Sequence, residues 1–255
     1  MPFGLGVGQV VALVRETRGF EGALPQISVS GEGASELALT LTTGGDAGAV
    51  TVGSDPGNAV VAIRLIDGEP SAAEIAILRK ISRSEMGLIV VRRGEGHVPY
   101  VLPGDIIDTD DIDSEGNLPM RDLLKSIARH AGDDGPALAA RLPILRAEVG
   151  RRLIAATAFA NAVIGASTKM QTAQLPVLSF AQSRMVLMLG LSRGDVLPRD
   201  PKHLALAAGP AVAACVGMGF GARTLVRRLP VNGRLVRAGV AYAGTRVLGE
   251  ARLRL

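Results

Sequence analysis

Residues 26–37, QISVSGEGASEL, decide the fold that this sequence predicts. A short run of residues suited to a β-strand leads into a turn that contains Gly31 and Gly33, and an Ala- and Leu-containing helical pattern begins directly afterwards. A strand, a glycine turn and a helix in this order form the outline of a phosphate-binding loop in an α/β domain. The stretch therefore raises the question of whether the chain binds a nucleotide.

The residues that make such a loop work are missing. A phosphate loop of the pattern G-x-x-x-x-G-K-[ST] cradles phosphate oxygens with backbone N–H groups, a lysine and a hydroxyl group that holds Mg²⁺. Here Gly31 and Gly33 are too close together, Ser35 or Glu36 stands where the lysine would fall, and no lysine precedes Lys80. A carboxylate at that place repels phosphate. We therefore expect a strand–turn–helix junction that has lost its phosphate site, and no cofactor.

The other signatures of a nucleotide hydrolase or an acyl hydrolase are also missing. A domain that reads guanine carries Asn-Lys-x-Asp after a buried strand, whereas residues 90–96 read VVRRGEG. The sequence has no G-x-S-x-G motif and only one cysteine, so it offers no hydrolase nucleophile. We predict no catalytic residue.

The first half of the chain has the pattern of a small α/β domain. Ser71 and Glu74 follow Pro70 as a capping box that opens a helix. The runs AVVAIRL and GLIVVR have no regular polar alternation, which favours strands buried on both faces of a parallel sheet. The predicted strands are 26–30, 48–53, 59–65 and 87–92, and the predicted helices between them are 33–42 and 71–85.

Strand patterns largely vanish after an acidic loop near residue 110, and the rest of the chain is predicted to be helical. We place the domain boundary near residue 135, with a degenerate GTPase-like α/β domain at 1–135 and an all-helical domain at 136–255. The predicted helices are 119–131, 137–168, 172–191, 201–228 and 234–252.

Charge divides between the two halves. Residues 136–255 hold 17 Lys and Arg against 4 Asp and Glu, whereas residues 1–135 hold 11 against 20. The two halves therefore face different surroundings or each other. A basic patch at Arg223, Arg227 and Arg228 suits anionic lipid better than nucleic acid, because no aromatic residues interleave for base stacking.

One helical segment has the length of a membrane span. The run 204–222, LALAAGPAVAACVGMGFGA, carries no charge and is followed at once by arginine. Ala213, Gly217 and Gly221 recur every four residues and form a smooth stripe that another helix, or a second copy of the chain, can approach closely. Its partner would be the uncharged stretch 153–168. A membrane hairpin and a buried hairpin of a water-soluble bundle both fit this pattern.

The acidic loop resembles a calcium-binding loop without completing it. Asp111, Asp113 and Glu115 occupy the first, third and fifth positions. However, Pro119 stands at the ninth position and Asp122 replaces the glutamate that would bind calcium through both oxygens. A solvated acidic loop is the favoured interpretation. The three histidines lie far apart in sequence, so no metal centre is predicted.

The helical half resembles a known family. Residues 175–194, LPVLSFAQSRMVLMLGLSRG, contain Gln182, Met185 and a closing glycine, and residues 237–251 read RAGVAYAGTRVLGEA. Both stretches resemble the helical domain of YcjF-like bacterial inner-membrane proteins, a domain also fused behind the G domain of some Era-like GTPases. The segment VPYVLPGDII, residues 98–107, is similar to one in actinobacterial relatives. The resemblance implies a membrane-associated domain attached to a GTPase-like one. It provides no catalytic residue.

Together these observations predict a non-catalytic adaptor or scaffold on the cytoplasmic face of the bacterial inner membrane. Its expected partner is an anionic membrane surface, and a homo-oligomer can form through the small-residue helix faces. One alternative is a divergent nucleotide hydrolase of the Era-like GTPase type that holds phosphate through the glycine turn and a basic residue from the helical half. A third is a soluble two-domain interaction module in the cytoplasm. The sequence leaves all three open.

Overall fold

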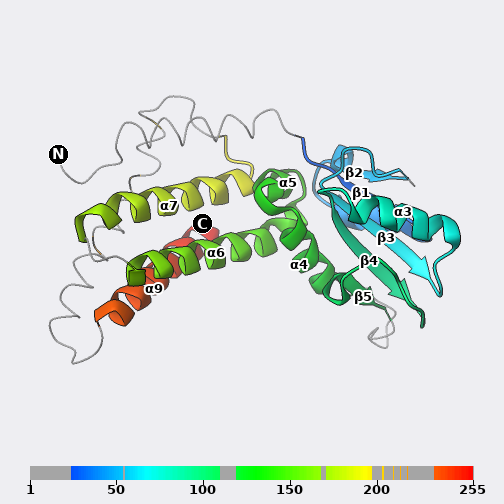
Figure 1. Cartoon of the computed structure of the whole chain (residues 1–255). Coiled ribbons are helices and arrows are strands. Elements are labelled where there is room, and N and C mark those ends of the chain that lie inside the picture. Colours follow the sequence, from blue (N-terminus) through cyan, green and yellow to red (C-terminus); the bar gives the residue numbers. More distant parts are fainter. Residues whose placement is uncertain are drawn as a thin grey trace. The chain divides into compact units, whose positions relative to one another are not determined.

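The structure, a computed structural model, describes residues 24–53, 55–109, 119–167, 171–196, 203, 209, 213, 217 and 233–254 (Figure 1). Its contacts separate two compact units, divided between Val149 and Gly150. The first is an α/β unit and the second is helical, as the sequence predicts. The predicted boundary at residue 135 precedes this division, because the helices that follow β5 complete the core of the α/β unit.

The α/β unit contains a five-stranded sheet in which every neighbouring pair is parallel. The strand order is β2-β1-β3-β4-β5, so the chain reverses its direction of winding between β1 and β3. Four strands lie where the sequence predicts them, and the short β5 was not predicted. Their bounds are β1 Ile27–Ser30, β2 Val50–Val52, β3 Val61–Asp67, β4 Gly87–Arg93 and β5 Ile106–Asp108.

Helices cover both faces of this sheet. On one face the core combines strand residues such as Ile63 and Ile89 with Leu37 of α2, Leu123 of α4 and Leu138 of α5. On the other face α3 contributes Leu78 and Ile81. Burial on both faces explains why the strands lack polar alternation. The helices are α2 Ala34–Leu41, α3 Ala72–Ser82, α4 Met120–His130 and α5 Gly135–Arg141.

The predicted capping box at the start of α3 is confirmed. The Ser71 hydroxyl accepts from the Glu74 backbone N–H at 3.3 Å, and the Glu74 carboxylate accepts from the Ser71 N–H at 2.7 Å. Both bonds satisfy backbone donors that lack partners within the helix.

The prediction of one helix over residues 137–168 was wrong. α5 ends at Arg141, a 3-10 turn spans Pro143–Leu145, and α6 spans Arg146–Ser167. Leu142 has φ −118° and ψ 90°, outside the helical region, because the ring of the following proline disfavours helical geometry in the residue before it. α5 therefore ends while it is packed in the core of the α/β unit, and α6 begins as a separate helix.

Arg141, at the end of α5, secures this arrangement. Its Nε and Nη2 atoms donate to Asp46 Oδ2 at 2.9 and 2.8 Å, and Nη1 donates to the carbonyl oxygen of Pro25 at 2.7 Å. The bonds between Arg141 and Asp46 link residues that are 95 positions apart in sequence. The hydrogen bond from Arg141, together with one from the backbone N–H of Gly48, lowers the pKa of the Asp46 carboxyl below its ordinary value.

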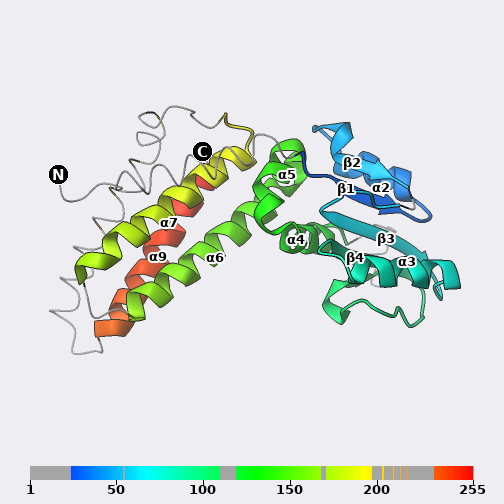
Figure 2. The same cartoon turned by 45° about the horizontal axis from the view of Figure 1, so that its top comes forward.

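The helical unit contains most of α6 together with α7, Gln171–Ser192, and α9, Gly233–Arg254. α6 and α9 run antiparallel and lie close together, since a Cβ atom on Gly150 would lie 2.5 Å from Leu253 and one on Gly165 would lie 3.1 Å from the carbonyl oxygen of Arg237. Figures 1 and 2 show the three helices side by side, with the end of α6 next to the beginnings of α7 and α9.

No helix within the described residues is both long and apolar enough to cross a membrane. Of the predicted span 204–222, the structure describes only residues 209, 213 and 217. Ala213 and Gly217 are exposed. Gly221 and the basic patch Arg223, Arg227 and Arg228 lie outside the described residues.

Candidate functional site

The glycine turn after β1 lies at the carboxyl edge of the parallel sheet. Gly31 has φ +105° and Gly33 has φ +80°, backbone conformations that favour glycine. Gly31 also packs directly against β3, because a Cβ atom there would lie 2.0 Å from the carbonyl oxygen of Leu65. The two glycines therefore allow a three-residue turn between β1 and α2 that fits closely against the neighbouring strand.

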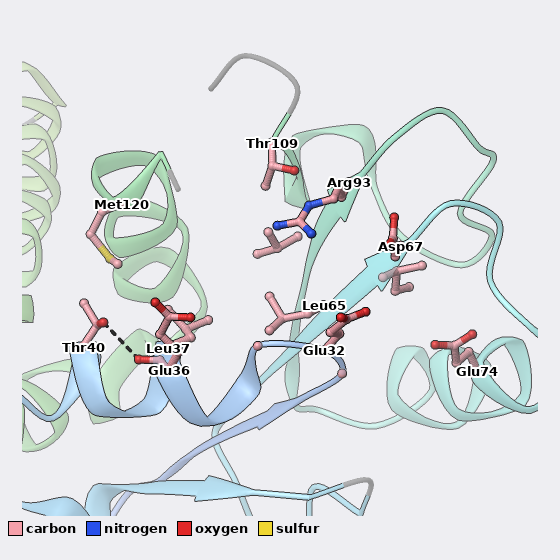
Figure 3. A pocket seen from close by; sticks show the side chains of 14 residues that line it. Glu32, Glu36, Leu37, Thr40, Leu65, Asp67, Glu74, Arg93, Thr109 and Met120 are labelled. Carbon is pink, nitrogen blue, oxygen red and sulfur yellow. Dashed lines mark hydrogen bonds between the residues drawn. The ribbon is translucent and has the colours of Figure 1, made fainter. Parts of the chain in front are cut away.

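A cleft of about 660 Å³ opens beside this turn (Figure 3). It lies where the winding of the sheet reverses, between β1 and β3, which is the position at which open α/β sheets bind ligands. Its walls come from the glycine turn, α2, the ends of β3 and β4, the beginnings of α3 and α4, and the residue after β5. The described lining residues are Gly31, Glu32, Gly33, Glu36, Leu37, Thr40, Leu65, Ile66, Asp67, Glu74, Val91, Arg93, Thr109 and Met120.

The charges around this cleft are predominantly negative. Four carboxylates line it, against the single guanidinium of Arg93, and no lysine is among the described residues of its wall. In Figure 3 the Arg93 side chain extends into the cleft above Glu32. Glu36 lines the cleft from the first turn of α2, while its neighbour Ser35 is exposed and is absent from that wall. The carboxylate that the sequence placed near the turn therefore faces the cleft.

Glu74 contributes to the acidic wall from the other side. Its carboxylate is held at the beginning of α3 by the N–H group of Ser71, as the capping box requires. A carboxylate is favoured at a helix N-terminus, where the free N–H groups create a positive potential. The N-terminus of α3 is therefore already neutralised by a side chain of the chain itself.

A second hollow of about 260 Å³ lies against the same turn on the α3 face of the sheet. Gly31, Leu65, Ile66 and Glu74 line both hollows. The smaller one contains Arg64 of β3, which is 8% exposed. Its Nη1 atom donates to the Ser30 hydroxyl at 2.5 Å.

Sequence reasoning missed this buried arginine. The signal was present, because Arg64 is the one charged residue within the run AVVAIRL. Burial lowers the pKa of the Arg64 guanidinium, while the charges of Asp55 and Glu74 act in the opposite direction. Arg64 thus carries a desolvated positive charge next to the glycine turn.

An ion pair lies at the end of β4. Arg92 donates from Nε to Asp108 Oδ1 at 2.7 Å, and its Nη2 atom lies 2.7 Å from the same oxygen. Thr109 donates from its hydroxyl to the carbonyl oxygen of Arg92 at 3.0 Å. These contacts join β4 to β5.

The described residues contain no group of three or more His, Cys, Asp or Glu that could hold a metal ion. Asp111, Asp113 and Glu115 lie outside the described residues. His130 Nε2 lies 2.7 Å from Asp105 Oδ1, and Arg129 donates to the same oxygen. Asp105 is buried, so this cluster joins the 3-10 turn before β5 to the end of α4.

The helical unit buries a polar cluster that the sequence did not predict. Asn161 of α6 and Gln182 of α7 donate to the hydroxyl oxygen of Thr245 in α9 at 2.9 and 3.1 Å. That hydroxyl donates in turn to the carbonyl oxygen of Ala241 at 2.7 Å. All three side chains are fully or almost fully buried. The cluster joins the three helices at one level.

Comparison with family models, with curated proteins and with solved structures finds no match for this chain.

Proposed function

We propose that this chain is a non-catalytic adaptor or scaffold. In this proposal the α/β unit is a GTPase-like domain that has lost its phosphate loop and its guanine-reading motif, and the helical unit associates with the cytoplasmic face of a bacterial inner membrane. The observation that carries the proposal is the charge of the cleft, whose described lining residues include four carboxylates and one guanidinium, at the position where open α/β sheets bind ligands.

Electrostatics argues against a nucleotide in this cleft. Phosphate groups bind where backbone N–H groups, lysine, arginine or Mg²⁺ compensate their negative charge. Glu32 lies on the glycine turn, and Glu36 lies in the first turn of α2. Both elements would have to face a bound phosphate group. Like charges at this range repel each other, and a partly enclosed cleft screens them less than open water does. A cationic or neutral group of a protein partner suits the cleft better.

The position of the glycine turn supports the GTPase-like part of the proposal. The glycine turn follows the first strand of a parallel sheet and leads into a helix, as a phosphate loop does. The cleft also lies at the reversal of the winding order. A lost site at an inherited position accounts for both observations. The resemblance of the helical half to YcjF-like proteins agrees with this interpretation.

The membrane association rests on the sequence and on the helical unit. The uncharged run 204–222 and the arginines that follow it favour an anionic membrane surface. The excess of basic residues after residue 135 also favours binding to an anionic membrane surface. A homo-oligomer formed through the small-residue stripe remains part of the proposal.

A divergent nucleotide hydrolase is the second candidate, and Arg93 favours it. Such an enzyme needs a basic residue within reach of the glycine turn, and Arg93 lines the same cleft as Gly31 and Gly33. This arginine belongs to the α/β unit, whereas the sequence-based alternative required a basic residue from the helical half. Its single charge is outnumbered by the surrounding carboxylates, so we rank this candidate below the adaptor.

Calorimetric titration of the full chain with Mg·GTP and with Mg·ATP tests the choice. The adaptor proposal predicts no saturable binding of either nucleotide. The hydrolase candidate predicts saturable binding that Arg93→Gln abolishes and that Arg79→Gln leaves unchanged. Arg79 is an exposed arginine of α3 outside the described lining of the cleft, and it therefore controls for a general loss of positive charge.

A further inference from the structure

The helical unit buries a polar cluster beside its apolar core and exposes several large apolar side chains. Its interior contains Asn161, Gln182 and Thr245, which are at most 1% exposed. Its surface shows Phe159 at 67% and Leu235 at 70% exposure. In water, large apolar side chains gain free energy by burial, and amide groups are usually placed outside. Polar groups inside and large apolar groups outside suit an apolar environment.

Most of the exposed large apolar side chains of the helical unit lie between the middle of the helices and one end of the bundle. Because α6 and α9 are antiparallel, the end of α6 lies beside the beginning of α9. We call the described parts of α6 from Phe159 to Ser167, of α7 from Val177 to Ser183 and of α9 from Gly233 to Thr245 the distal end. Its exposed large apolar residues are Phe159, Val163, Val177, Leu235 and Tyr242.

The distal end carries charge of one sign only. Its described residues include Arg234 and Arg237 and no acidic residue. The opposite end of the same three helices mixes the two signs, with ion pairs such as Arg246 with Glu250 and Arg252 with Asp195 at 2.7 Å. Apolar side chains accompanied only by arginine match the headgroup and acyl boundary of an anionic bilayer, where arginine reaches the lipid phosphates.

We infer that the distal end docks on the surface of an anionic lipid bilayer and inserts its apolar side chains at the interface. The inference rests on the membrane association in the proposed function and identifies the part of the chain that touches lipid. Docking at the interface needs no described helix to span the bilayer, which agrees with the lengths and charges of α6, α7 and α9.

Co-sedimentation of the full chain with lipid vesicles tests the inference. The vesicles contain phosphatidylglycerol mixed with phosphatidylcholine, and vesicles of phosphatidylcholine alone serve for comparison. Leu235→Gln should weaken binding to the anionic vesicles about tenfold or more, because an amide replaces the apolar side chain that inserts at the lipid interface. Val247→Gln is the matched control, since Val247 is 69% exposed on the same helix but lies beyond the distal end. It should leave binding unchanged.

Variants of Arg234 and Arg237 test whether arginine contributes to binding of the anionic vesicles. Arg234→Gln and Arg237→Gln should each reduce binding to the anionic vesicles about fivefold. The double variant should bind vesicles with and without phosphatidylglycerol equally. Raising the salt concentration should weaken binding by the wild type in the same way. Circular dichroism and size-exclusion chromatography of every variant confirm that the helices and the oligomeric state are retained.

The outcomes distinguish failure of docking at the distal end from failure of the proposed membrane association. Strong vesicle binding that Leu235→Gln and Val247→Gln affect equally, or not at all, overturns the inference and leaves the proposed membrane association intact. No binding to either vesicle overturns the membrane association itself. If Leu235→Gln instead dissociates an oligomer while lipid binding persists, the distal end is covered by a second copy of the chain, and the inference fails.

Discussion

Gly31 and Leu65 touch through their backbones, and this contact fixes the turn that borders the cleft. A Cβ atom on Gly31 would lie 2.0 Å from the Leu65 carbonyl oxygen and 2.9 Å from the carbonyl carbon. Neither atom belongs to a flexible side chain, so the strand itself would have to move. The closeness of β1 and β3 at the reversal of the sheet therefore depends on the absence of a side chain.

Gly31→Ala should lower the free energy of unfolding by on the order of 3 kcal/mol, from the positive φ and the clash together. Gly33→Ala is the matched control. Gly33 also has positive φ, but its Cβ atom would lie 3.9 Å from the nearest side-chain atom of Leu65, so the cost should be about 1–2 kcal/mol. Urea denaturation measures both. Equal losses for the two variants would show that the backbone conformation matters and the contact with Leu65 does not.

Loss of the capping box at the start of α3 should destabilise the α/β unit. Ser71→Ala removes the hydroxyl that accepts from Glu74 N–H, at a cost of about 0.5–2 kcal/mol. Ser82→Ala, at the last residue of the same helix, should change the unfolding free energy by about 0.5 kcal/mol or less. Thermal unfolding of both variants provides the comparison. An unchanged Ser71→Ala protein would contradict the role of the cap.

The pair of Asp46 and Arg141 should make stability depend on pH at the acidic end. The pKa of Asp46 is lower in the folded chain than its ordinary value of 3.8, so its stabilising effect is present above that value. It is lost as pH falls through the lower pKa of the folded state. Asp46→Asn should therefore unfold at lower urea than the wild type near neutral pH, and the difference should shrink below pH 3.8.

Arg141→Gln tests the cause of this dependence. The hydrogen bond from Arg141 is the largest contribution to the lowered pKa of Asp46, so removing the guanidinium should remove most of the pH-dependent difference. It should also add a loss that does not depend on pH, because the bond to the carbonyl oxygen of Pro25 disappears. Curves for wild type and Asp46→Asn that run parallel across the acidic range would contradict the assignment.

The polar cluster of the helical unit should be sensitive to removal of one oxygen. Thr245→Val keeps the shape of the side chain and leaves the amide groups of Asn161 and Gln182 without the acceptor they share. We expect a loss of about 1–3 kcal/mol for each buried donor left unpaired. Thr40→Val is the control, because Thr40 makes the same kind of bond to the carbonyl oxygen four residues earlier but is exposed. Urea denaturation of both variants checks this.

Much of the fold could be predicted because its signals are local. Buried parallel strands produce uninterrupted apolar runs, and Ser71 with Glu74 marks the start of a helix whatever the rest of the chain does. The short β5 escaped prediction because three residues, Ile106–Asp108, leave no periodicity to recognise. The break at Leu142 depends on the residue before Pro143, and the helical pattern on both sides concealed it.

The site was only partly predictable, because it depends on contacts between distant segments. The sequence located the glycine turn and the carboxylate of Glu36 beside it. It did not reveal that Asp67, Glu74 and Arg93 join them from β3, α3 and β4, since strand order decides which loops meet. The hydrogen bonds among Asn161, Gln182 and Thr245 likewise depend on helix pairing that periodicity does not determine.

The most direct test of the central claim is the nucleotide content of the full chain purified without added nucleotide. Acid extraction followed by anion-exchange chromatography measures guanine and adenine nucleotides per chain. An acidic cleft that has lost its phosphate chemistry predicts only substoichiometric traces, both in wild type and in Arg93→Gln. A near-equimolar amount of GTP, GDP or ATP in the wild type, lost in Arg93→Gln, would contradict the adaptor account and establish a working nucleotide site at the glycine turn.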